Sequence, residues 1–148
     1  MTTYTLQHPE KGLISYTDKK RWFWLCAIIW SLLPLPIMAA FLITDNPWLL
    51  VLPLEVAFLL VPLIDYLIGT DTSNPPEEIV PQLEADKFYR CVLILAIPMH
   101  FATLGAGALL VGTHELSMGF FIAFAAVMGL YSGMSINTAH EIGHKTTK

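Results

Sequence analysis

The stretch CVLILAIPMHFATLGAGALLVGT, residues 91–113, contains no Asp, Glu, Lys or Arg. About 20 apolar residues in an α-helix span the roughly 30 Å hydrocarbon core of a bilayer, because each residue adds about 1.5 Å. Three other windows, residues 22–43, 48–68 and 116–139, have the same character, and Glu55 and Asp65 are the only charged residues in the four windows. The sequence therefore predicts an all-α integral membrane protein with four transmembrane helices.

The composition of the whole chain excludes several other classes. Of its 148 residues, 55% are apolar and 14% are charged, whereas soluble domains contain about 25% charged residues. The net charge of -4 and the absence of a basic stripe argue against a nucleic-acid partner. Cys26 and Cys91 both lie inside apolar windows, without the spacing of a zinc knuckle or a disulfide framework. Membrane lipid is the expected surrounding.

All eight Lys and Arg residues lie on one side of this four-span topology. Four of them precede the first window, two lie between the second and third windows, and two follow the fourth. The two short links on the opposite side contain none. Because positive charges are retained in the cytoplasm, we expect both chain ends to be cytoplasmic.

This topology divides the chain into three regions. Residues 1–21 form a cytoplasmic N-terminal segment, and residues 22–139 form the transmembrane region. A cytoplasmic loop at 69–90 separates its two helix pairs, and apolar residues between 77 and 90 predict a short amphipathic surface helix there. Residues 140–148 form a polar end that contains a histidine motif.

The candidate metal-binding and catalytic side chains are concentrated in the stretch NTAHEIGHK, residues 137–145. If the fourth helix continues through them, His140 and His144 lie on one face, about 5–6 Å apart at Cβ. Two imidazoles so placed can bind one metal ion or contribute to two neighbouring ions. In zinc proteases the glutamate of HExxH, here Glu141, is the general base. A chance occurrence of the motif at a polar helix end is the alternative.

Two polar residues inside the windows have alternative interpretations. His100 lies about 15 Å into its window, too deep to share a metal ion with the end of the fourth helix. It is either a neutral histidine hydrogen-bonded within the bundle or a residue of a substrate channel. Asp65 is level with the histidine motif, so it either reaches the membrane surface or orients a metal-bound imidazole.

Several motifs, taken in order, resemble the integral-membrane alkane hydroxylases, the rubredoxin-dependent alkane 1-monooxygenases. They are Pro62-Leu63-Ile64-Asp65, Asn74-Pro75-Pro76-Glu77-Glu78, Pro98-Met99-His100 and the stretch from Asn137 to Lys145. The resemblance extends from about the first window to the last residue. It implies that the four spans correspond to the first four helices of a six-helix bundle.

The resemblance also implies an activity. Members of this family are non-haem di-iron enzymes that insert one oxygen atom of O₂ into a terminal C–H bond of a medium-chain alkane, releasing a primary alcohol. Electrons come from rubredoxin and its NAD(P)H-dependent reductase, and the expected location is the bacterial inner membrane. His140 and His144 match the first histidine box, so the resemblance makes them iron ligands, with Glu141 beside them in a supporting role. A homo-oligomer is compatible with this interpretation.

The sequence departs from the family pattern at its end. It stops at Lys148, before the later histidine boxes and the last two spans. We therefore expect an N-terminal portion that is inactive alone. Two alternatives stay open: an intramembrane zinc protease with Glu141 as its base, and a non-catalytic membrane module.

Overall fold

The backbone consists of a β-hairpin followed by four long helical segments. A computed structural model describes residues 1–70 and 74–144, without the side chains of residues 139 and 141–144. The elements are β1 (Thr2–His8), β2 (Gly12–Asp18), η1 (Arg21–Leu25), α1 (Cys26–Leu32), α2 (Pro34–Thr44), η2 (Pro47–Val51), α3 (Leu52–Glu55), η3 (Val56–Leu60), α4 (Val61–Ile68), η4 (Glu77–Ile79), α5 (Val80–Ala85), α6 (Lys87–Thr113) and α7 (Met118–His144).

Four helical segments in the described part of the chain are long and apolar enough to cross a membrane. They are Arg21–Thr44, Pro47–Ile68, Lys87–Thr113 and Met118–Thr138. The fold class expected from the sequence, an all-α membrane protein with four transmembrane helices, is confirmed.

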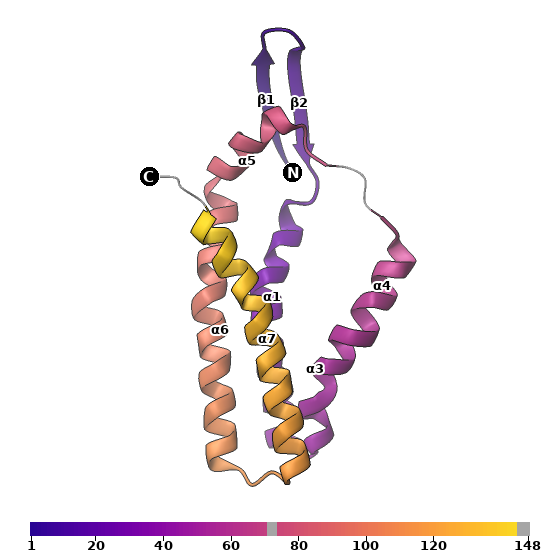
Figure 1. Ribbon diagram of the computed structural model, residues 1–148, viewed down its shortest axis with the longest axis vertical. Coiled ribbons are helices and arrows are strands. Elements are labelled where there is room, and N and C mark those ends of the chain that lie inside the picture. Colours follow the sequence, from indigo (N-terminus) through magenta and orange to yellow (C-terminus); the bar gives the residue numbers. More distant parts are fainter. Residues whose placement is uncertain (71–73, 145–148) are drawn as a thin grey trace.

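The bundle has two unlike ends (Figure 1). At one end lie the short connections, residues 45–46 and 114–117, and we call it the loop end. At the opposite end lie the hairpin, α5 and the end of α7, and we call it the terminal end. Helices α6 and α7 run side by side along the bundle and α1 packs against both, whereas α4 diverges from them toward the terminal end.

Prolines mark the interruptions of the first two membrane segments. Pro34 begins α2, Pro53 and Pro62 lie in the first turns of α3 and α4, and the residues between α3 and α4 form a π-helical turn. Proline has no backbone N–H to donate, so it is tolerated best in a first helical turn. Helix α6, by contrast, continues through Pro98 without a break.

The N-terminal segment contains a hairpin that the sequence analysis did not predict. Strands β1 and β2 are antiparallel, with His8 opposite Gly12 at the turn. Gly12 has a φ of 72°, which a side chain would disfavour. The His8 imidazole closes the turn by accepting the backbone N–H groups of Glu10 and Lys11, each at 3.2 Å.

The surface helix predicted at 77–90 is shorter in the structure. Its helical residues end at Ala85, and Asp86 has an extended backbone and caps the next helix. The Asp86 carboxylate accepts the N–H of Phe88 at 2.8 Å, which is the usual role of aspartate before a first helical turn. Helix α6 therefore begins at Lys87, and the residues up to Arg90 belong to the third membrane segment.

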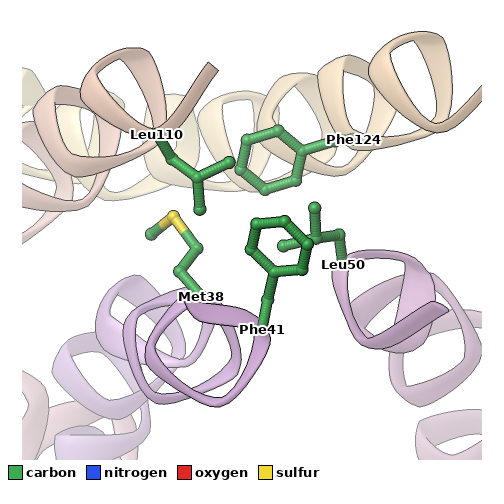
Figure 2. Close-up of a cluster of buried hydrophobic side chains, with 5 residues drawn as sticks. All are labelled: Met38, Phe41, Leu50, Leu110 and Phe124. Atoms are coloured by element: carbon green, nitrogen blue, oxygen red, sulfur yellow. The ribbon is translucent and has the colours of Figure 1, made fainter. Parts of the chain in front are cut away.

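A hydrophobic core holds the loop end together. Met38 and Phe41 of α2, Leu50 of η2, Leu110 of α6 and Phe124 of α7 pack against one another (Figure 2). Every membrane segment contributes at least one of these side chains. All five are at most 4% exposed, so the loop end is where the four segments are joined.

Gly107 allows α6 and α7 to approach each other next to this core. A Cβ built at Gly107 would lie 3.0 Å from the Met128 methyl carbon and 3.5 Å from the Phe124 ring. For Gly105, Gly129 and Gly133 such a Cβ would meet nothing within 4 Å among the described residues. Close approach in this part of the bundle therefore depends on a single glycine.

Candidate functional site

The histidine motif lies at the terminal end of α7. This helix runs from Met118 to His144 without a break, so His140 and His144 lie one helical turn apart. The side chain of His140 is exposed. The side chains of Glu141 and His144, and all of residues 145–148, lie outside the described part of the structure. The helical register on which a paired histidine site depends is present in the backbone.

An apolar cavity of about 310 Å³ lies between α6 and α7, just below the histidine motif. It is lined by Ala96, Ile97, His100, Phe101 and Leu104 of α6 and by Ser132, Ser135, Ile136 and Thr138 of α7. Its volume is at the lower end of the range of about 300–1,000 Å³ that is typical of ligand pockets. Thr138 precedes His140 by two residues, or about 3 Å along the helix axis, so the cavity reaches the base of the motif.

The apolar space continues along the same pair of helices toward the loop end. A second cavity of about 240 Å³ shares Leu104 with the first, and Val111 and Phe121 are among its other lining residues. Both cavities are lined by α6 and α7 alone. The two cavities are separate but share Leu104, and we call them together the α6–α7 path, whose lining residues extend from the level of Phe121 to the level of Thr138.

His100 is the one histidine in the wall of this path. Its side chain is buried, with the residue 8% exposed, and its Nδ1 atom has no hydrogen-bond partner among the described residues. The His100 and Phe101 ring centres are 6.1 Å apart. An unpaired buried nitrogen does not fit the expectation of a histidine hydrogen-bonded within the bundle. Other atoms of the residue line the cavity, whereas this nitrogen has almost no accessible surface.

Other polar side chains lie near the level of His100 in the bundle. Thr103, one turn from His100, donates to the carbonyl oxygen of Ser31 in α1 at 2.7 Å. The Trp30 and Tyr131 rings stack with centres 5.0 Å apart, and neither the Trp30 Nε1 nor the Tyr131 hydroxyl has a hydrogen-bond partner among the described residues. A polar layer therefore crosses α1, α6 and α7 near the middle of the bundle.

The structure does not bring Asp65 to the histidine motif. Asp65 is exposed on α4, where every residue from 61 to 68 is exposed, and the terminal end of α4 lies apart from that of α7 (Figure 1). Glu55, at the junction of α3 and η3, is exposed as well. Within the described residues no three His, Cys, Asp or Glu side chains are grouped as a metal site.

A charged network that the sequence analysis missed fixes the hairpin to the start of α6. The Tyr4 hydroxyl donates to the Asp86 carboxylate at 2.6 Å, and the Arg21 guanidinium donates to the same carboxylate at 2.5 and 3.2 Å. Arg21 also lies over the Phe88 ring, 4.3 Å from its centre, a favourable cation–π geometry. The sequence signal was weak, because Tyr4 and Asp86 are 82 positions apart.

Electrostatics in this network follow from its geometry. The hydrogen bonds from the Arg21 guanidinium hold the pKa of the Asp86 carboxyl well below its usual range. Burial, together with the hydrogen bond to Asp86, raises the pKa of Tyr4 to about 12. At neutral pH the network therefore contains an ionised Asp86 and a protonated Tyr4.

A second attachment lies on the outer surface of the hairpin. The Lys11 ammonium group contacts the Glu78 carboxylate, and this contact raises the pKa of Lys11 and lowers that of Glu78. The Gln82 side-chain amide donates to the Thr5 carbonyl oxygen at 3.1 Å. These contacts involve α5 and the turn before it, so residues 77–85 support the hairpin.

The known proteins to which the chain is similar share one name. The chain is 39% identical over 132 residues to alkane 1-monooxygenase 1 of Alcanivorax borkumensis and 38% identical over 132 residues to the alkane 1-monooxygenase of Pseudomonas putida. The alkane 1-monooxygenase of Ectopseudomonas oleovorans is also 38% identical. Each of these matches covers 88% of this chain and 32% of the relative, so the chain spans about a third of the length of the curated relatives it matches. No family model matches the chain.

Proposed function

We propose that this chain, which is homologous along most of its length to proteins named alkane 1-monooxygenase, forms part of a membrane enzyme that oxidises medium-chain alkanes to primary alcohols. The observation that carries the proposal is the apolar cavity between α6 and α7, which ends two residues before His140. An alkane has no polar group, so its binding depends on apolar surface. Each buried methylene contributes about 0.8 kcal/mol.

The position of the cavity supports entry of the substrate from the membrane. Helices α6 and α7 are both membrane segments, and an alkane dissolved in lipid is already at their depth. The cavity walls would exclude water and align the chain along the helix axes, with one end toward His140. In the proposal His100 is a polar residue of this channel, and Phe101 and Leu104 provide apolar contacts.

The metal centre in this proposal is a pair of iron ions. His140 and His144 fit part of such a site, because neutral imidazole is a good ligand for iron and the unbroken helix keeps the two residues one turn apart. Two histidines do not complete a site for two ions, so the other ligands would come from outside the described residues. When bound, the iron would supply the activation of O₂.

Two acidic residues are proposed to contact the histidine ligands of this centre rather than the iron itself. Glu141 follows His140 directly, and its proposed role is to orient or balance the charge of a metal-bound histidine. Asp65 has the same proposed role, which would require α4 to lie closer to α7 than it does in this structure. The exposed terminal half of α4 leaves room for such a movement.

Electron supply and membrane orientation complete the proposal. In the described part of the chain, the Lys and Arg residues lie in the hairpin, in the turn that follows it and in the first turn of α6, all at the terminal end, and the positive-inside rule would place this end in the cytoplasm. Rubredoxin and its NAD(P)H-dependent reductase, which are soluble electron carriers, would reach the motif from that side. The membrane would be the bacterial inner membrane.

The proposal can be tested with a chimera. Residues 1–148 replace the matching third of the Pseudomonas putida alkane 1-monooxygenase, and membranes containing the chimera are assayed for conversion of octane to octan-1-ol with rubredoxin, its reductase and NADH. The purified chimera is analysed for bound metal. About two iron ions per chain and octanol formation, both lost in His140→Ala, are the expected results.

Two results would contradict the proposal. Zinc in place of iron would favour a protease, and Glu141→Gln would then abolish peptide cleavage. A folded chimera with iron but with no octanol formation would show that the chain does not support this reaction. A His114→Ala variant serves as the control, because His114 is an exposed histidine at the loop end.

A further inference from the structure

A third pocket lies at the terminal end and shares no lining residue with the α6–α7 path. Its volume is about 320 Å³, and residues of β2, α5 and two membrane segments line it. Trp24 belongs to the first turn of the segment Arg21–Thr44, and Tyr89 to the first turn of Lys87–Thr113. The pocket therefore lies where two membrane segments begin, at the level where phospholipid headgroups meet the protein.

The charged side chains of this pocket favour a positively charged ligand group. Its lining contains two carboxylates, Asp18 and Glu84, and one ammonium group, that of Lys20. Neither carboxylate forms an ion pair with another described residue. Asp18 is 5% exposed and accepts the backbone N–H of Lys20 at 2.9 Å and the Tyr89 hydroxyl, so it acts on the pocket through its charge. Glu84 is exposed and is the carboxylate that a ligand can contact.

Aromatic rings in the same lining suit an ammonium group. The Trp24 and Tyr89 rings meet edge to face, with their centres 5.1 Å apart and their planes at 70°. Tyr89 is 4% exposed and Trp24 is 41% exposed, so Tyr89 supports the Trp24 ring and leaves part of it open. Tyr16 of β2 is half-buried in the same lining. A cation over the face of such a ring is attracted by its electrons, most strongly over tryptophan.

The combination of charges and rings separates one headgroup class from the others. An anionic headgroup would meet more negative than positive charge in the lining, and like charges repel. A quaternary ammonium group has no N–H and cannot donate a hydrogen bond to Glu84. A primary ammonium group has three N–H donors and the charge that the rings attract. The Lys20 ammonium group also has three donors, so it can bind a phosphate oxygen in addition to any other partner.

We propose that this pocket binds the headgroup of a phospholipid that ends in a primary ammonium group, as in phosphatidylethanolamine. The ammonium group donates to Glu84 beside the Trp24 ring, the phosphate lies toward Lys20, and the acyl chains follow the two membrane segments. A lipid is the expected ligand, rather than a soluble amine, because Trp24 and Tyr89 belong to membrane segments.

A lipid in this position would also strengthen the attachment of the hairpin. The pocket lining includes residues of β2, of α5 and of the first turn of α6, so one headgroup would contact all three elements. A ligand that binds only the docked hairpin stabilises the docked state. The lipid site depends on no metal and on no alkane.

Native mass spectrometry of the purified full chain in detergent measures the binding. Phosphatidylethanolamine, phosphatidylcholine and phosphatidylglycerol with the same acyl chains are titrated separately. We expect phosphatidylethanolamine to bind about fivefold more tightly than phosphatidylcholine, as one net hydrogen bond allows, and phosphatidylglycerol to bind most weakly. O-Phosphoethanolamine, a soluble analogue of the headgroup, should not displace phosphatidylethanolamine at equal concentration.

Two pairs of variants identify the residues responsible. Glu84→Gln should remove the preference for phosphatidylethanolamine over phosphatidylcholine. Glu10→Gln, which removes the same charge from the exposed hairpin turn, should retain it. Trp24→Leu should weaken binding of phosphatidylethanolamine about threefold, whereas Trp48→Leu, at an exposed tryptophan of the loop end, should leave it unchanged.

Hydrogen exchange of the wild-type protein in nanodiscs gives a test that needs no variant. Replacing part of the phosphatidylcholine by phosphatidylethanolamine should slow backbone exchange in residues 13–18 and 80–85 by about twofold or more. Exchange in residues 114–117, at the loop end, should not change.

Four outcomes would overturn the proposal. They are equal binding of phosphatidylethanolamine and phosphatidylcholine, an unchanged preference in Glu84→Gln, displacement of the lipid by O-phosphoethanolamine, and hydrogen exchange that does not respond to the lipid. None of them would affect the iron content or octane oxidation of the chimera. Conversely, a chimera without iron would contradict the proposed function and leave the lipid site intact.

Discussion

The loop end and the terminal end of the bundle differ in how their helices are joined. At the loop end the two connections are short, residues 45–46 and 114–117, so the helices they join must lie side by side, and five side chains from all four membrane segments form one core. At the terminal end, α4 ends at Ile68 and the next described helical turn begins at Glu77. Helix α4 diverges there (Figure 1).

Because of this difference, the side chains that stabilise the bundle and the histidine motif lie at opposite ends of the molecule. The buried core lies far from the histidine motif, which is at the opposite end of α7. The two α6–α7 cavities lie between these regions, since the lining of one includes Phe124 of the core and the lining of the other includes Thr138. The well-packed end thus holds one end of α7, and the opposite end of the same helix carries the histidine motif.

The largest expected effect is on activity, with no loss of folding. In the chimera, His140→Ala should reduce octane oxidation more than about 100-fold, because removing a direct ligand exceeds the 10–100-fold typical of residues one step further from a metal. The loop-end control His114→Ala should retain full activity. Iron content and octanol formation are the measurements, and retention of both in His140→Ala would remove the motif from the proposed centre.

The next effect is on stability, and it is confined to the loop end. Phe124→Ala should lower the free energy of unfolding by about 3–5 kcal/mol, since the lost burial of the ring and the cavity left behind both contribute. Phe58→Ala is the matched control, because Phe58 of η3 is 64% exposed and Phe124 only 3%. Its expected effect is below about 0.5 kcal/mol.

Unfolding of both variants in detergent would be followed by circular dichroism against denaturant. Equal losses in the two variants would mean that the second membrane segment contributes as much stability as the core, and that the contrast between the two ends is wrong.

A smaller effect concerns the hairpin at the terminal end. Asp86→Asn keeps a side chain that can cap α6 but removes the negative charge beside Arg21, so we expect the docked hairpin to lose about 1–2 kcal/mol. Amide hydrogen exchange of β1 should accelerate about tenfold. The exchange of residues in α7 should not change, and a general acceleration would show that the network supports the whole bundle.

The same network predicts a pH range for hairpin docking. Docking lowers the pKa of Asp86, so its contribution is complete above the ordinary value of about 3.9 and is lost as the pH falls below it. Docking raises the pKa of Tyr4 to about 12, so its contribution is complete below about 10 and is lost as the pH rises toward 12.

The Tyr4 value can be measured by ¹³C NMR of labelled tyrosine. A titration near 12 in the wild type, moving toward 10 in Asp86→Asn, is the expected result. A Tyr4 that titrates near 10 in the wild type would show that its hydroxyl is not held by Asp86.

The smallest effect is expected at Lys11. Its contact with Glu78 is exposed to solvent, and such pairs contribute little because water and salt screen them. Lys11→Gln should therefore leave β1 hydrogen exchange unchanged within error at 0.15 M salt. Acceleration as large as that in Asp86→Asn would make Lys11 a principal attachment of the hairpin.

Several features were predictable because they depend on local composition. The four membrane segments follow from the scarcity of charge over windows of 21 or more residues, since the bilayer penalises charge regardless of how the helices are arranged. The spacing of His140 and His144 follows from helical periodicity alone. The hairpin strands contain Thr, Tyr and Ile, which are favoured in β-structure, but each strand is short and its pairing joins residues that are not near neighbours in the sequence. The surface helix was predicted too long because Asp86 can stand either inside a helix or at its N-cap.

The sequence by itself therefore determined that the chain is a four-span membrane protein with a histidine motif at the end of its fourth helix, because hydrophobicity and helix period act between near neighbours. Only the tertiary structure decided which faces meet. It placed Tyr4 and Arg21 on Asp86, left α4 apart from α7, and put His100 in the wall of a cavity below the motif. These contacts join residues tens of positions apart, and their existence depends on how whole helices pack rather than on any local pattern.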